Sequence, residues 1–295
     1  MCSVKSLLLF CLALLVVCGS GFAQDLTGIW KGKYSYPAES DREPGHFWVI
    51  MVQNESELFG FAKELNTFGT EEVPWLHAML KGSVDKATGK IRFTKSYDGT
   101  GEQNHDVEYR GRVAENGTKV QGTWKIPDQR GADFTLEKVR KPGRCETSVV
   151  GVWAGEFQYP DDVQMPPVKF WMIVACFGKG VTGLVKEPNT FGEGDDPWLH
   201  ALLKGHIDGE TGRMTFTKTY DGTSGVDHEV KYEGRLSESA TKLSGEWTMP
   251  DSWGGKFTAK KVAPKNWAEL TLSKPMEVER IQPAAIPVIP WNGGD

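Results

Sequence analysis

Two nearby segments of the sequence place basic and aromatic side chains in phase with apolar ones. Lys95 alternates with Phe93 and Tyr97, and His105 has the parity of Val107. Residues two apart share a face of a strand, so one buried face would gather Lys95, Tyr97 and His105. A buried Lys or His must be paired or shift its pKa, which makes this group a candidate for chemistry. His105 would act as a general base, and Lys95 would stabilise developing negative charge. Alternatively, Lys95 lies near a rim where its ammonium reaches water.

The same group returns later in the chain as Lys218, Tyr220 and His228. It belongs to a duplication in which residues 26–139 recur at 149–262 with a constant offset of 123. A repeat this regular predicts two copies of one structural unit, and therefore two related copies of any site that the unit carries.

A second group of candidates lies on and beside the connection between the third and fourth predicted strands, residues 63–77, which is long for a hairpin. Its aromatic rings would form the wall of a binding site, and Lys or His would orient a polar end of the ligand. Alternatively, the connection packs on itself and plugs one end of the unit, with Asn66 making a local turn bond. The predicted ligand-binding residues are Phe68, Trp75, His77 and Tyr97, with their counterparts Phe191, Trp198, His200 and Tyr220.

Strands must position these residues, because apolar and polar residues alternate with period two through each unit. Asp98-Gly99 and Asp221-Gly222 suit tight hairpin turns, and no long helix-period segment intervenes. The chain is therefore expected to be all-β, with two tandem up-and-down eight-stranded meander barrels. In the first unit the strands are predicted near 28–36, 46–53, 58–64, 75–83, 89–97, 105–113, 119–126 and 132–139.

The first strand of each unit opens with a Gly-x-Trp motif, Gly28-Ile29-Trp30 and Gly151-Val152-Trp153. Together with the strand count, this resembles the opening of calycin barrels, the group that includes lipocalins and avidins. The resemblance covers each repeat as a pattern. It implies secreted eight-stranded barrels that bind small apolar or amphipathic molecules.

The chain divides into five parts. Residues 1–23 resemble a signal peptide, 24–141 and 149–262 are the repeats, 142–148 are a linker, and 263–295 form a Pro-rich tail. We therefore expect a secreted, extracellular protein. A retained N-terminal anchor, or a lipid on Cys18, is the alternative. The tail could bind a protein partner or form a chain end without structure.

Two cysteines remain after removal of the signal segment, Cys145 and Cys176. They could pair as a disulfide or stay separate thiols. Asn54 and Asn116 open Asn-x-Ser/Thr sequons, so a eukaryotic source would make this a glycoprotein.

Composition argues against several other classes of function. The formal net charge is −5, and the absence of a basic cluster argues against a nucleic-acid partner. No second apolar run approaches the ~20 residues of a membrane span. The histidines and cysteines lack zinc spacing, and phosphate-binding and dinucleotide-binding motifs are missing, so neither a metal nor a cofactor is expected.

Three functions fit these features. The first is a secreted protein that binds a small apolar or amphipathic molecule in a calycin-like barrel. The second is a secreted, cofactor-independent enzyme, such as a luciferase or oxygenase, in which His105, His228, Lys95 and Lys218 are the catalytic candidates. The third is an extracellular matrix or interaction protein.

Overall fold

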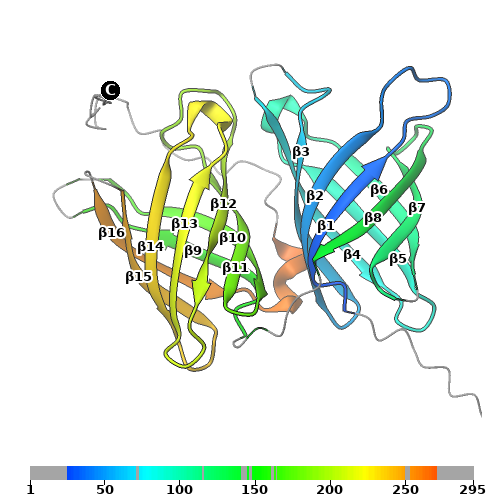
Figure 1. The fold of residues 1–295 in the computed structure, drawn as a ribbon. Helices are drawn as coiled ribbons and strands as arrows, with labels where there is room; N and C mark the ends of the chain where they lie inside the picture. Colours follow the sequence, from blue (N-terminus) through cyan, green and yellow to red (C-terminus); the bar gives the residue numbers. More distant parts are fainter. Residues whose placement is uncertain are drawn as a thin grey trace, which may run out of the picture.

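The chain folds into two closed barrels of eight antiparallel strands each (Figure 1), which confirms the predicted fold class. The computed structural model describes residues 25–70, 73–114, 116–140, 145, 148–160, 163, 165–249 and 253–270. The expected signal segment and the tail beyond residue 270 lie outside the described residues.

In the first barrel each strand pairs with the next along the chain, and β8 closes onto β1. In β1 and β5 the alternation of apolar and polar residues follows the barrel wall, with inward side chains buried and outward ones more exposed. The strands are β1 (Gly28–Tyr34), β2 (Gly45–Asn54), β3 (Glu57–Leu65), β4 (Trp75–Val84), β5 (Lys90–Tyr97), β6 (Asp106–Val113), β7 (Lys119–Lys125) and β8 (Ala132–Arg140).

The second barrel repeats this order and closes between β16 and β9. Its strands are β9 (Gly151–Phe157), β10 (Val168–Phe177), β11 (Gly180–Pro188), β12 (Trp198–Ile207), β13 (Arg213–Tyr220), β14 (Glu229–Leu236), β15 (Lys242–Thr248) and β16 (Gly254–Lys261). Short 3₁₀ turns, η1 (Thr100–Glu102) and η2 (Thr223–Gly225), follow β5 and β13.

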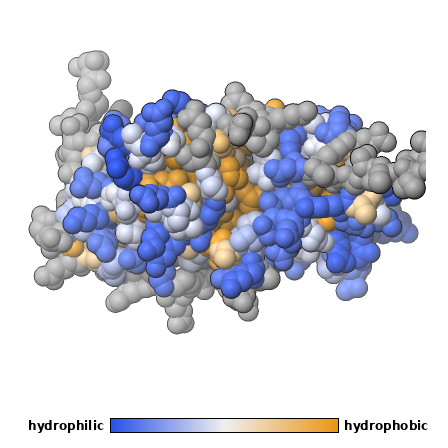
Figure 2. Space-filling model, turned by 90° about the horizontal axis from the view of Figure 1, so that it is seen from below, coloured by the Kyte–Doolittle hydropathy of each residue, from blue (hydrophilic) through white to orange (hydrophobic). Residues whose placement is uncertain are grey.

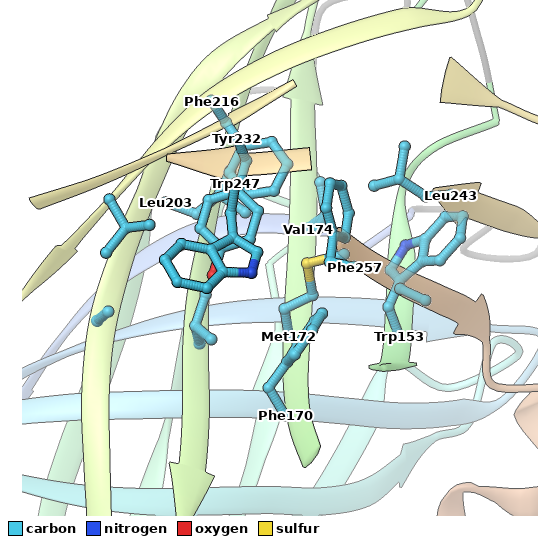
Figure 3. Packing of buried hydrophobic residues seen from close by; sticks show 14 of the residues in the cluster. Trp153, Phe170, Met172, Val174, Leu203, Phe216, Tyr232, Leu243, Trp247 and Phe257 are labelled. Carbon is cyan, nitrogen blue, oxygen red and sulfur yellow. The ribbon is translucent and has the colours of Figure 1, made fainter. Parts of the chain in front are cut away.

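Large aromatic side chains fill much of each barrel. Trp30 and Trp153 are fully buried, and each indole nitrogen donates a hydrogen bond to a backbone carbonyl four residues earlier. In the second barrel, Phe216 stacks on Tyr232 with 4.7 Å between ring centroids (Figure 3). Burial of such rings, each removing much apolar area from water, is the main stabilising contribution.

A pair of glycines lets two neighbouring strands of the first barrel approach closely. Gly111 faces Gly122 across β6 and β7. A Cβ on Gly122 would lie 2.0 Å from the carbonyl oxygen of Arg110, so a larger residue would push the strands apart.

The two barrels contact each other through an apolar cluster on their outer walls. The continuous apolar run in β2 is buried on both faces, because its outward side chains pack against the second barrel. Trp267, on the 3₁₀ helix η3 (Pro264–Glu269), packs in the same cluster, and apolar residues show between the polar halves in Figure 2. The buried members are Ile50, Val52, Phe59, Phe61, Met79, Val152, Ile173, Ala175 and Trp267.

Cys145 and Cys176 form a disulfide with 5.6 Å between their Cα atoms. It ties the segment between the barrels to β10. Of the two alternatives that the sequence allows, pairing and separate thiols, the structure has the pair. Of the predicted glycosylation sites, Asn54 ends β2, and the exposed Asn116 lies in the turn between β6 and β7.

Candidate functional site at the mouth of the first barrel

A cavity of about 270 Å³ opens at one end of the first barrel. This volume is close to the lower end of the ~300–1,000 Å³ range of small-molecule sites. The lining combines rings with a few polar groups, as such sites do. Its aromatic members are Tyr34, Tyr36, Phe68, Tyr97, Tyr109 and Trp124.

The outer wall of the cavity is a set of rings in edge-to-face contact. Tyr34 contacts Tyr36 and Trp124 at centroid distances of 5.5 and 5.7 Å. The indole nitrogen of Trp124 donates to the carbonyl oxygen of Ser35 at 2.9 Å. Contacts of this kind fix ring orientation, so the wall is formed before any ligand binds.

Tyr109 forms the inner part of the wall. Its ring stacks on Phe93 at 4.6 Å and meets Phe134 edge-on at 4.9 Å. Tyr109 is 3% exposed, and its hydroxyl has no hydrogen-bond partner among the described residues. Burial raises the pKa of this phenol well above its ordinary value, so the hydroxyl keeps its proton and remains a donor. A phenol donor in the wall of an open cavity can bond to water or to an acceptor atom of a ligand.

Beneath the cavity lies a buried group of three polar residues. Lys95 is paired with Glu64 at 2.8 Å and donates to the hydroxyl of Tyr97 at 2.8 Å, while Tyr97 donates to the other oxygen of Glu64. Burial lowers the pKa of Lys95, and the charge of Glu64 opposes that shift. The alternative in which Lys95 reaches water at a rim is therefore wrong, because its side chain is 1% exposed.

His105 lies at the cavity beside this group. Its ring centroid is 4.7 Å from that of Tyr97 and 6.4 Å from that of Phe68. Burial and the nearby charge of Lys95 lower the pKa of His105, so its imidazole is neutral near pH 7 and can donate or accept one hydrogen bond.

The connection before β4 brings Phe68 to the cavity and holds it there. Asn66 accepts from the backbone N–H of Gly69 at 2.7 Å and donates to the carbonyl of Val73 at 2.9 Å. The connection is therefore fixed by the local bonds of its own Asn66, and the same connection places Phe68 in the wall of the cavity.

The second barrel contains the same inner group. Lys218 is paired with Glu187 at 2.9 Å and donates to Tyr220 at 2.6 Å. His228 and Phe191 flank Tyr220 with centroid distances of 4.8 and 5.8 Å. The duplication thus preserves the buried Lys–Glu–Tyr group inside each barrel.

Four of the predicted ligand-binding residues lie elsewhere, in the contact between the barrels. His77 and His200 stack on each other, and Lys63 and Lys186 lie over the rings of Trp75 and Trp198 at 4.3 and 4.2 Å. The structure therefore separates these residues from Phe68 and Tyr97, with which the sequence grouped them.

The sequence pattern does not single out several residues of the cavity and of the contact between the barrels. Glu64 and Glu187 lie one residue before the ends of β3 and β11, and only their parity with buried neighbours indicates an inward position. Asp98 and Asp221 fit turn positions, yet each accepts from a Lys of the other barrel and lies 2.9 Å from a His of that barrel. Tyr34, Tyr36, Tyr109 and Trp124 line the cavity, although none of them is among the predicted ligand-binding residues.

Within the described ranges, no group of three or more His, Cys, Asp or Glu side chains is arranged to hold a metal ion. Likewise, none of the helices in the described part of the chain is both long and apolar enough to cross a membrane.

Comparison with protein-family models gives no match, and comparison with curated protein sequences gives none either. Three solved structures share partial similarity. The agglutinin of Burkholderia oklahomensis is 12% identical with a TM-score of 0.26, covering 82% of this chain and 97% of its own. A DUF3598-family protein of unknown function from Nostoc punctiforme is 11% identical with a TM-score of 0.22 (80% and 96% covered). Kievitone hydratase from Nectria haematococca is 10% identical with a TM-score of 0.22 (86% and 95% covered). At these TM-scores the similarities assign neither a family nor a function to this chain.

Proposed function

We propose that this protein binds a small, partly aromatic molecule at the mouth of its first barrel. The observation that carries the proposal is the cavity of about 270 Å³ with the unpartnered hydroxyl of Tyr109 in its wall. The aromatic rings supply apolar contact area, and Tyr109 donates a hydrogen bond to an acceptor atom of the ligand.

The rigidity of the site supports binding. Tyr34, Trp124 and Tyr109 are each held by neighbouring rings, and the Lys95–Glu64 pair holds Tyr97 from below. A wall that is already ordered loses little conformational entropy on binding, so more of the contact energy contributes to affinity.

The geometry favours binding over the catalytic alternative. Lys95 was expected to stabilise developing negative charge, but its ammonium is already paired with Glu64 and bonded to Tyr97. His105 remains available, so an assay for turnover of any bound molecule, repeated with His105→Ala, distinguishes an enzyme from a binding protein.

We propose further that the protein is an exported, calycin-like binding protein. The closed eight-stranded meander fits such a role, and the signal-like residues 1–23 with the Cys145–Cys176 disulfide fit an oxidising compartment. Detection of the cleaved protein in culture medium would support export, whereas retention of the whole chain inside the cell would contradict it.

A fluorescence screen tests the binding proposal. A panel of small aromatic and aliphatic molecules is titrated against the full mature protein while tryptophan emission is recorded. Ligands of the cavity should change the emission of wild type, and Trp124→Phe should lose most of that change because Trp124 lines the cavity. If no molecule of the panel binds, or if the change persists in Trp124→Phe, the proposed site is wrong.

A further inference from the structure

The two barrel mouths differ although the barrel interiors match. The interiors share the Lys–Glu–Tyr group, a His and a Phe at equivalent positions. Around the openings, polar residues of the first repeat correspond to apolar residues of the second. The corresponding pairs are Arg42 and Met165, Gln103 and Val226, and Arg130 and Trp253.

Trp253 packs into the mouth of the second barrel. Its ring meets Tyr159 edge-on at 5.9 Å, and Tyr159 in turn meets Trp247 at 5.9 Å. The backbone N–H of Met249 donates to the carbonyl of Trp253 at 2.7 Å, which fixes the backbone of Trp253 just before β16. Trp253 therefore adds its own indole to the aromatic cluster of that mouth.

The first barrel has no such ring at the corresponding position. Arg130 stands there, is exposed, and pairs with Glu39 instead of packing on the core. The space next to Tyr36, which corresponds to Tyr159, belongs to the cavity. A planar ring that enters the first mouth would thus make the contacts that Trp253 makes in the second.

The polar lining of the first mouth combines one cation with side chains that can donate hydrogen bonds. The guanidinium of Arg42 lies 5.5 Å from the ring of Tyr36, and Gln103, His105 and Tyr109 add further donors. Asp41 and Glu43 flank Arg42 in the sequence, but Arg42 forms no ion pair within the described part of the chain. Among the described residues, the lining contains no carboxylate. An unpaired Arg beside aromatic rings suits a ligand that carries both a ring and an anionic group.

On the basis of the function proposed above, we propose that the first barrel binds an aromatic carboxylate, whereas Trp253 occupies the equivalent site in the second. The aromatic ring of the ligand lies against Tyr36 and Trp124, and its carboxylate faces Arg42. An oxygen at the opposite end of the ring accepts from Tyr109. The second barrel, with Met165 in place of Arg42, lacks the matching cation.

Calorimetry with two matched probes tests this assignment on the full mature protein. The probes are 4-hydroxycinnamate and its neutral amide, which share the ring and the hydroxyl and differ in charge. Wild type should bind one equivalent and favour the carboxylate by about two- to fivefold, as expected for a partly exposed ion pair. Arg42→Met, which introduces the residue of the second repeat, should abolish that preference while the amide still binds.

Two further variants test the role of Trp253. Trp253→Arg introduces the residue of the first repeat and should raise the stoichiometry from one equivalent to two. Arg130→Trp should weaken binding of both probes to the first barrel at least tenfold. Thermal melting of each variant verifies that it is folded, and Trp253→Phe replaces Trp253→Arg if the latter unfolds, with a second site of lower affinity expected.

Two equivalents bound by wild type, one equivalent bound by the folded Trp253 variants, or an unchanged preference in Arg42→Met would each overturn the inference. If neither probe binds but other molecules of the fluorescence panel do, the ligand class is wrong and the proposed function stands. If nothing binds in either experiment, the proposed function fails as well.

Discussion

The imidazole rings of His77 and His200 stack face to face, with centroids 3.6 Å apart and planes 1° from parallel. These two residues correspond in the duplication, so the repeats meet across a local two-fold axis. Each His lies 2.9 Å from the Asp of the other barrel, His77 from Asp221 and His200 from Asp98. The contact is therefore built from the same residues used twice, as in a symmetric homodimer.

Removal of one of these carboxylates should lower the stability of the folded protein. Asp98 accepts from Lys186 at 2.5 Å and lies 2.9 Å from His200, and all three side chains are buried. Asp98→Asn leaves Lys186 without its partner charge, which should lower the free energy of unfolding by about 3–5 kcal/mol. Urea denaturation measures the loss. The matched control is Asp85→Asn in an exposed turn, and an equal effect of the two substitutions would contradict the account.

The same contact makes stability depend on pH. Burial lowers the pKa of His200 to about 4, below the ~6.5 of an unfolded His, so the unfolded state binds the extra proton first. Stability is therefore full above pH 6.5 and falls as the pH drops from 6.5 to 4, by about 3 kcal/mol from this residue. Urea titrations at several pH values should show this loss in wild type and a smaller one in His200→Phe. The exposed His46 provides the control, and a His46→Phe variant that flattens the profile equally would refute the explanation.

The buried Lys95–Glu64 pair should show strong coupling. Lys95→Met leaves Glu64 buried without its cation, which should cost about 3–5 kcal/mol of stability. The double variant Lys95→Met, Glu64→Gln removes both charges and should recover part of that loss. A double-mutant cycle in urea measures the coupling, and additive single effects would show that the pair does not act as a unit.

The disulfide should stabilise the segment that enters the second barrel. Cys145 and Cys176 are separated by 31 residues, and closing a loop of that length is worth about 3–4 kcal/mol by the chain-entropy argument. The Cys145→Ser, Cys176→Ser double variant should lose that amount in thermal or urea unfolding. A reducing agent should lower the stability of wild type to that of the variant and leave the variant unchanged.

The strand pattern was predictable because a period-two alternation is local. Every predicted strand of the first repeat corresponds to an observed one, within two residues at either end. A continuous apolar run such as Phe47 to Val52 is typical of a strand buried on both faces, but it does not show that the second face packs against the other barrel.

The positions of Trp75 and His77 could not be derived in the same way. Trp75 begins β4, as the strand pattern predicts, but His77 lies on the outer face of that strand while Leu76 and Ala78 point inward. Parity assigns residues to two faces but does not say which neighbour covers the outer face. Partners such as Glu64 for Lys95, or Asp98 for His200, come from long-range packing that no local pattern encodes.

The difference between two matched substitutions tests the central claim most directly. Tyr109→Phe and Tyr232→Phe each remove one hydroxyl at equivalent positions of the two barrels. Calorimetric titration with 4-hydroxycinnamate, or with the tightest ligand of the panel, should show affinity reduced about five- to tenfold by Tyr109→Phe, from the loss of one hydrogen bond, and unchanged by Tyr232→Phe. Equal affinities for the two variants, or a loss confined to Tyr232→Phe, would contradict a ligand site in the first barrel.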